Sequence, residues 1–69
     1  MKISARNSLK GTITKVTVGS VNTEISIEIS PGVEITSIIT KTSAENLGLK
    51  EGSTVYAVIK ASDVILATD

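Results

Sequence analysis

The chain has 69 residues with no Cys, no His and a single aromatic side chain, and its seven basic and seven acidic residues cancel to a net charge of zero. This composition excludes disulfides and a cation site built from thiolates or imidazoles. It also argues against nucleic-acid binding, which needs clustered basic residues and rings for base stacking. No apolar run approaches the roughly 20 residues of a membrane span, and no secretory signal opens the chain, so we expect a cytoplasmic protein.

The short length also limits the hydrophobic core. A domain of this size buries only about 60% of the surface that its unfolded chain exposes. Such domains gain stability from disulfides, a structural metal or oligomerisation, and this composition favours oligomerisation. We therefore expect one domain, spanning residues 1–69, that associates with copies of itself.

The first half of the chain is predicted to consist of strands. Ile, Val and Thr make up 26 of the 69 residues (10 Ile, 7 Val and 9 Thr), and such β-branched residues favour a pleated sheet over a helix. A first strand is expected at about residues 9–18. Its apolar phase slips between Ile13 and Val16, which indicates a β-bulge or a sharp bend. Gly19-Ser20 marks the turn to the next strand.

The next two strands form the clearest hairpin. Between Thr23 and Ile29 the residues alternate, with Ile side chains on one face and Glu and Ser on the other. Ser30-Pro31-Gly32 places Pro where a tight turn needs a φ of about −65° and Gly where it needs a positive φ. A further alternating strand is expected from Val33 to Thr40.

A single short helix is expected after this strand. Thr42 and Glu45 have the spacing of a capping box, in which a hydroxyl and a carboxylate three residues apart satisfy the first N–H groups of a helix. Gly48 supplies the glycine that commonly ends a helix. We expect Leu47 and Leu49 to hold this helix against the sheet.

The last part of the chain is predicted to return to strand. Residues 54–61 are apolar on both faces, because Tyr56 and Val58 occupy the positions that would otherwise be polar. In a chain this short, we expect the second apolar face to form an interface. Val64-Ile65-Leu66 is expected to form a final strand. The predicted fold is therefore all-β with one short helix, an OB-like five-stranded barrel in the order β-β-β-α-β-β.

The residue types exclude most catalytic chemistry and favour the binding of an anion. Without His the chain lacks the usual general base for neutral pH, and it has no phosphate-binding loop, so we expect no enzymatic activity. A doubly charged oxyanion needs about two positive charges and a shell of hydrogen-bond donors. Arg6, Lys60 and the corner from Thr40 to Ser43 offer guanidinium, ammonium and hydroxyl donors beside expected strand ends.

Several motifs resemble those of the Mop, or molbindin, family of molybdate-binding and tungstate-binding domains. They are Ser4-Ala5-Arg6-Asn7 with Leu9-Lys10-Gly11, then Ile39-Thr40 with Ser43, Leu47-Gly48-Leu49-Lys50-Glu51-Gly52, and finally Lys60-Ala61-Ser62-Asp63-Val64. The first and last motifs carry the more specific signal, because a Leu-Gly-Leu-x-x-Gly run is common. The resemblance covers nearly the whole chain and implies a single Mop domain at residues 1–69.

The resemblance also implies a site and an assembly. Family members of this size are OB-like barrels that form hexamers, as trimers of dimers, with molybdate or tungstate in pockets between subunits. The implied donors are Ser4, Arg6, Lys60 and the amide of Ala61 from one subunit, with Ala5 and Ser62 beside them, and Thr40 and Ser43 from the neighbour. We therefore expect cytoplasmic storage and homeostasis of molybdenum, with no cofactor, no nucleic acid and no membrane as partner. The residue types do not separate molybdate from tungstate.

The two cations and the two hydroxyl residues of the helix corner also have purely structural interpretations. Arg6 could be a solvated surface cation, Lys60 a charge that protects an edge strand from aggregation, and Thr40 with Ser43 the cap of the short helix. An alternative function is therefore a small β-barrel that serves oligomerisation or protein interaction and binds no ligand. A nucleic-acid-binding barrel is a third possibility, which the charge and the aromatic content disfavour.

Overall fold

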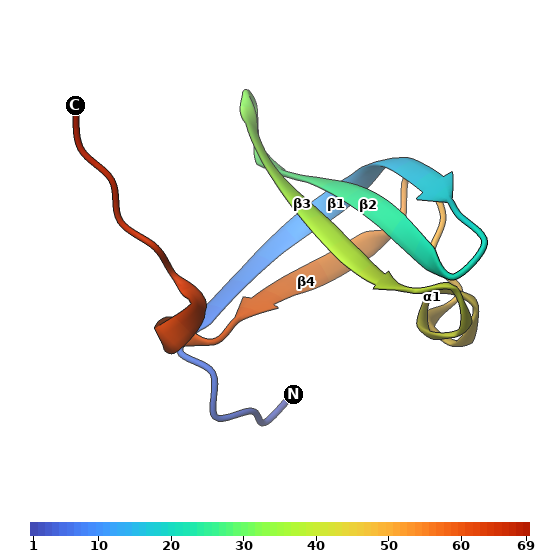
Figure 1. Cartoon of the computed structure of the whole chain (residues 1–69), viewed down its shortest axis with the longest axis horizontal. Coiled ribbons are helices and arrows are strands. Elements are labelled where there is room, and N and C mark those ends of the chain that lie inside the picture. The colour runs from blue at the N-terminus through green and yellow to red at the C-terminus, as the bar shows by residue number, and fades with distance from the viewer.

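The computed structural model describes all 69 residues as one curled antiparallel sheet with a short helix at one end (Figure 1). The elements are β1 (Asn7–Val18), β2 (Asn22–Ser30), β3 (Val33–Thr40), α1 (Lys41–Leu47), β4 (Thr54–Ile59) and the 3₁₀ turn η1 (Ala61–Asp63). The strand order in the sheet is β3-β2-β1-β4. The molecule is therefore a half-barrel that is all-β apart from one short helix, as the sequence predicts. No helix is long and apolar enough to cross a membrane.

β1 is the long strand of the sheet, and it pairs with different neighbours along its length. Its first half, from Asn7 to Thr12, pairs with β4, and its second half, from Thr12 to Val18, pairs with β2. The register to β2 shifts between Ile13 and Lys15, which confirms the irregularity expected from the slip in apolar phase. The strand can therefore bend across the half-barrel and still direct Ile13 and Val16 toward the core.

Gly11, near the middle of β1, occupies a position that leaves no room for a side chain. A methyl group there would lie 2.6 Å from Cγ2 of Ile27 and 2.7 Å from the main-chain oxygen of Glu28. Glycine in a strand often marks such a close approach of another segment. The missing side chain therefore lets β1 and β2 pack closely where the sheet curls.

The hairpin between β2 and β3 forms as expected. Pro31 and Gly32 make the turn, and Gly32 has a φ of +80°, a conformation that favours glycine. β3 then pairs with β2 from Val33 to Thr40. The alternation in the sequence therefore predicts both strands to within one residue at each end.

The short helix is present, but its first turn differs from the prediction. Thr40, not Thr42, caps α1: its Oγ1 accepts a hydrogen bond of 3.0 Å from the amide of Ser43. The helix starts earlier because the Lys41 amide donates to the Val21 carbonyl oxygen over 2.8 Å, a tertiary contact that fixes the chain at this point. Gly48 ends the helix with a φ of +63°, as expected.

The contacts of α1 with the sheet also correct a prediction. Leu47 is 68% exposed, whereas Ala44 is the buried residue of the helix. Leu49 packs against the core as expected. The helix therefore rests on the sheet through a small side chain, and the residue after its glycine supplies the larger apolar contact.

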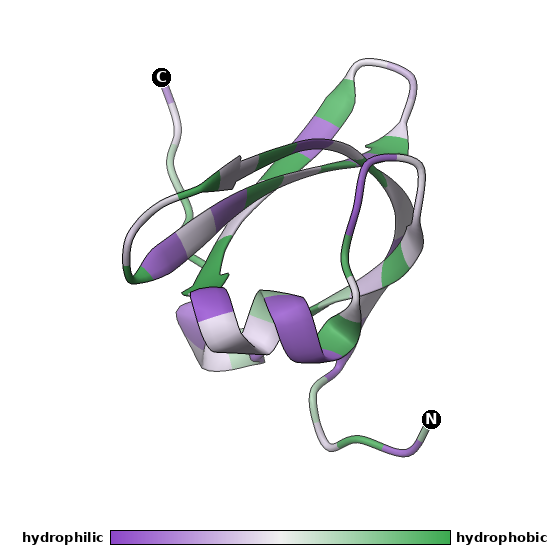
Figure 2. Ribbon diagram, turned by 90° about the vertical axis from the view of Figure 1, so that its right-hand side faces the viewer, coloured by the Kyte–Doolittle hydropathy of each residue, from purple (hydrophilic) through white to green (hydrophobic).

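The core lies on the concave face of the sheet. Its buried residues are Ile13, Ile25, Ile27 and Ala57, and partly buried side chains pack around them. Apolar and polar residues alternate along much of β1, β2 and β3 (Figure 2), so each of these strands presents an apolar face to this core, whereas β4 is apolar on both faces. The concave side is not closed, however, because β3 and β4 are the two edges of the sheet.

The predicted fifth strand is absent, so the barrel has four strands of its own and not five. Val64, Ile65 and Leu66 lie outside the sheet, and Ile65 and Leu66 are 91% and 88% exposed. In η1, the Asp63 amide donates to the Lys60 oxygen over 2.8 Å, and beyond this turn the chain leaves the body of the molecule (Figure 1). The segment has the residues of a strand, but it has no neighbouring strand in its own chain.

Candidate functional site

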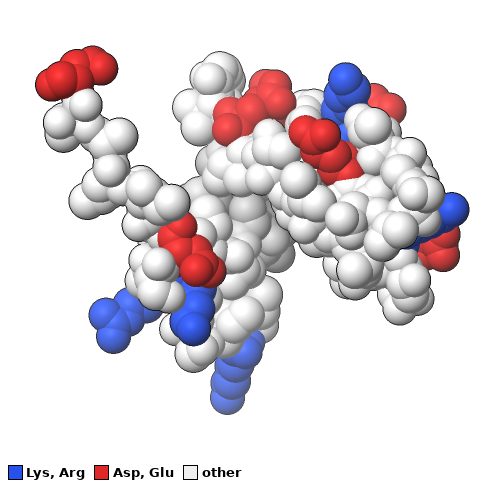
Figure 3. Space-filling view, in the orientation of Figure 1, with Lys and Arg blue, Asp and Glu red and all other residues white.

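The fold brings Arg6 and Lys60 to the same end of the sheet. Arg6 directly precedes β1 and Lys60 directly follows β4, and the terminal pair between these strands is Asn7 with Ile59. Paired residues in antiparallel strands have Cα atoms about 4.5–5.5 Å apart, so the main chains of the two cations are close neighbours. Both side chains are exposed, and Lys and Arg side chains gather at this end in the surface view (Figure 3).

Four further predicted residues lie beside this pair of cations. Ser4 and Ala5 directly precede Arg6, where the chain bends before it enters β1. Ala61 and Ser62 directly follow Lys60 as the first residues of η1. The first N–H groups of a 3₁₀ turn have no acceptor within the turn, so the amides of Ala61 and Ser62 are available to an external acceptor. One corner of the molecule therefore combines two positive charges, hydroxyls and main-chain donors.

Thr40 and Ser43 form a second, separate polar corner. The Thr40 hydroxyl donates to the Ser43 hydroxyl over 2.8 Å, while it accepts from the Ser43 amide. Because one hydroxyl proton is used between the two side chains, the Ser43 proton is left to donate outward. Both residues are exposed. The interpretation of Thr40 and Ser43 as the cap of the short helix is therefore correct, and the Ser43 hydroxyl proton remains free to donate to another group.

The two polar corners lie at opposite ends of the sheet. Asn22, at the start of β2, pairs with Thr40, whereas Asn7, at the other end of β1, lies beside the Arg6 corner. β1 has 12 residues, which at about 3.3 Å per residue correspond to about 40 Å of extended chain, so even as a bent strand its two ends are far apart in a molecule with a long axis of 35 Å. A single chain therefore brings Arg6 and Lys60 together but does not bring Thr40 and Ser43 to them.

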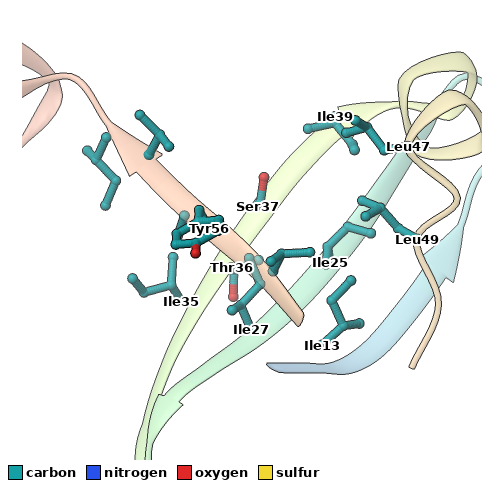
Figure 4. Close-up of a pocket in the computed structure, with 14 residues that line it drawn as sticks. Ile13, Ile25, Ile27, Ile35, Thr36, Ser37, Ile39, Leu47, Leu49 and Tyr56 are labelled. Carbon is teal, nitrogen blue, oxygen red and sulfur yellow. The ribbon is translucent and has the colours of Figure 1, made fainter. Parts of the chain in front are cut away.

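Two features of the structure were not foreseen from the sequence. A groove of about 350 Å³ opens between β3 and β4, and twelve of its fourteen lining residues are apolar (Figure 4). A smaller cavity of about 150 Å³ lies under α1, and Thr23, which lines it, is 1% exposed with no hydrogen-bond partner for its hydroxyl. The only sequence signal for the second feature is that Thr23 shares the alternation of Ile25 and Ile27.

These features define a small OB-like β domain with donor groups at its two ends, and the TOBE domain family matches residues 3–66 of the chain. The chain is 50% identical over 66 residues to molybdenum-pterin-binding protein 3 of Clostridium pasteurianum, covering 96% of this chain and 97% of that protein. The structure of MopII from the same organism superposes with a TM-score of 0.91 at 46% identity, covering 97% of this chain and all of that one.

A third similarity is to ModG, described as a cytoplasmic molybdate-binding protein and solved with molybdate bound. Its structure matches with a TM-score of 0.89 at 48% identity, over 94% of this chain and 46% of that one. The chain therefore belongs to the Mop, or molbindin, family of TOBE domains, which confirms the resemblance noted in its motifs.

Proposed function

We propose that this protein binds molybdate or tungstate and serves as a cytoplasmic store that buffers molybdenum. The observation that carries the proposal is the proximity of Arg6 and Lys60, which flank the terminal Asn7–Ile59 pair, beside the free amides of η1. The names of its relatives support the ligand, since they are molybdenum-pterin-binding and molybdate-binding proteins. These relatives are named as binding proteins and not as enzymes, and the description of ModG as cytoplasmic supports the location.

The chemistry of this corner suits a fully deprotonated dianion. Arg6 can donate two parallel hydrogen bonds to one edge of an oxyanion, and Lys60 adds a point charge that completes the neutralisation. Ser4, the amides of Ala61 and Ser62, and the free hydroxyl proton of Ser43 add uncharged donors. The guanidinium, the ammonium and the amides can only donate, so the proton of a protonated oxyanion such as hydrogen phosphate would find an acceptor only at a hydroxyl oxygen, which disfavours that anion.

The complete pocket is proposed to lie between two subunits. Within one chain Thr40 and Ser43 are at the far end of the sheet from Arg6, so they can join the same pocket only if they come from a neighbouring copy. The exposed groove between β3 and β4 also supports association, because a monomer rarely leaves a large apolar surface in water. A hexamer built as a trimer of dimers satisfies both requirements.

Titration calorimetry with molybdate, tungstate and sulfate, together with native mass spectrometry, tests the proposal. Wild type should bind the two larger oxyanions and bind sulfate more weakly. Arg6→Ala should lower the molybdate affinity at least a hundredfold, because removing one partner of a buried charge pair costs about 3–5 kcal/mol. Lys10→Ala, which removes an exposed cation within β1, is the matched control and should bind normally.

Two outcomes would contradict the proposal. Normal molybdate binding by Arg6→Ala would make Arg6 a surface cation without a role in the site. An oligomer that binds none of the three anions would instead favour the alternative function, a barrel that serves association alone.

A further inference from the structure

Asp63 is an acidic residue in a corner that otherwise collects cations and hydrogen-bond donors. It is the last residue of η1, three positions after Lys60, and it is exposed. The other six acidic residues lie in β2, β3 and α1, in the turn before β4 or at the chain end: Glu24, Glu28, Glu34, Glu45, Glu51 and Asp69. Asp63 is therefore the one acidic side chain that the fold carries next to Arg6 and Lys60.

The 3₁₀ turn places Asp63 close to Lys60. The Asp63 amide donates to the Lys60 carbonyl oxygen over 2.8 Å, and residues three apart in such a turn have Cα atoms about 6 Å apart, at about 2.0 Å of rise per residue. Lys60 is the N-cap of η1, and the side chains at the N-cap and three residues later lie on the same side of a turn. Acidic atoms lie beside the Lys and Arg side chains at this end of the surface (Figure 3).

The Asp63 carboxylate has no structural task within the chain. A carboxylate at its position commonly reaches back to accept from the N-cap amide. Here it takes part in none of the side-chain hydrogen bonds, which involve Thr14, Thr40 and Ser43. Its negative charge therefore acts mainly on the groups around it, and these are the cations of the anion-binding corner.

We propose that Asp63 limits the affinity of this corner for a dianion, so that the protein releases what it binds. The inference rests on the proposed function, and Asp63 acts in it through its charge and not as a ligand. Arg6 and Lys60 together balance the two charges of a dianion, whereas Asp63 leaves the occupied corner with one negative charge in excess. This repulsion acts through space, so it raises the dissociation constant without any change in the pocket.

The size of the effect follows from distance and salt. In a medium like water, one charge about 7 Å from a dianion weakens binding by about fivefold at 0.01 M salt, where the Debye length is about 30 Å. At 1 M salt the Debye length is about 3 Å, and the same repulsion almost disappears. The contribution of Asp63 should therefore be recognisable by its dependence on salt.

Asp63→Asn tests the inference, with Asp69→Asn as the matched control. Asn keeps the size of Asp and the amide that closes the turn, and it removes only the charge. At 0.01 M salt calorimetry should show Asp63→Asn binding molybdate about fivefold more tightly than wild type, and the gain should vanish at 1 M salt. Asp69→Asn removes an equal charge at the C-terminus, well away from η1 (Figure 1), and should bind as wild type does. Asp63→Glu, which keeps the charge, should also match wild type.

The outcomes separate this inference from the proposed function. If wild type binds molybdate and Asp63→Asn binds no more tightly, the inference is overturned and the proposed function stands. Weaker binding by Asp63→Asn would show that the carboxylate positions the turn and does not oppose the anion. A gain that persists at 1 M salt, or a changed oligomer in native mass spectrometry, would also overturn the inference. If neither wild type nor Asp63→Asn binds molybdate, the proposed function fails, and this inference fails with it.

Discussion

Replacing Gly11 by Ala adds one methyl group at a point where β1 and β2 have no space for it. The new carbon would lie 2.6 Å from Ile27 Cγ2, 2.7 Å from the Glu28 main-chain oxygen and 2.9 Å from Ile29 Cδ1, whereas ordinary contacts begin at 3.4 Å. The oxygen belongs to the main chain of β2 and Ile27 is buried. Neither atom can move away without shifting the strand, so the clash must be relieved by opening the sheet.

The expected cost of this substitution can be estimated from two opposing effects. Overpacking a filled core costs about 1–3 kcal/mol, while replacing Gly by Ala in a strand returns about 0.5–1 kcal/mol of conformational entropy. At the middle of these ranges the net loss of stability is about 1 kcal/mol, and at the upper limit it reaches about 2.5 kcal/mol. With an m-value of about 1 kcal/mol per molar urea for a small domain, the unfolding midpoint should fall by about 1 M.

Urea unfolding followed by far-UV circular dichroism measures this shift. All samples need the same protein concentration, because association stabilises the folded chain. Ser8→Ala, an exposed position in the same strand, is the control and should stay within about 0.5 kcal/mol of wild type. A Gly11→Ala variant as stable as Ser8→Ala would refute the close packing of β1 on β2.

Three further substitutions or assays follow from the structure. Thr23→Val removes a buried hydroxyl that has no partner and should raise the free energy of unfolding by about 1 kcal/mol or more; a lower melting temperature would show that the hydroxyl is hydrogen-bonded, for example to water. Thr40→Ala removes the helix cap and should cost about 1 kcal/mol, whereas Thr40→Ser should melt near wild type; equal melting of both variants would contradict the capping role. A labelled oligonucleotide should not shift in an electrophoretic assay at physiological salt, because a net charge of zero releases few counterions; a salt-dependent shift would restore the nucleic-acid-binding alternative.

Local patterns in the sequence account for most of the fold. Strict alternation defines β2 and the glycine in its turn defines the hairpin, since both depend only on neighbouring residues. The slip between Ile13 and Val16 likewise locates the bulge in β1. The start of the helix was misplaced because a contact from Val21, distant in sequence, decides which Thr becomes the cap.

The remaining differences concern contacts that local sequence patterns do not specify. Val64–Leu66 has strand composition, but a strand forms only where another strand is available to pair with it. The closeness of Arg6 and Lys60 depends on the register between β1 and β4, which residue types alone do not fix. Arg6 and Lys60 were candidates because of their donor chemistry beside expected strand ends, whereas Ser4 was added by the family resemblance. All three stay predictions until the variants are measured.

The placement of the two polar corners at opposite ends of one sheet has a consequence for stoichiometry. If each pocket takes the Arg6 corner of one chain and the Ser43 corner of another, every chain contributes one half to each of two pockets, so there is one such pocket per chain whatever the size of the ring. Oligomers mixed from Arg6→Ala and Ser43→Ala subunits would then contain some pockets with both halves intact, although neither variant alone has one. In such an oligomer each pocket is formed by two neighbouring subunits, so a substitution in one subunit affects a pocket that it shares with another.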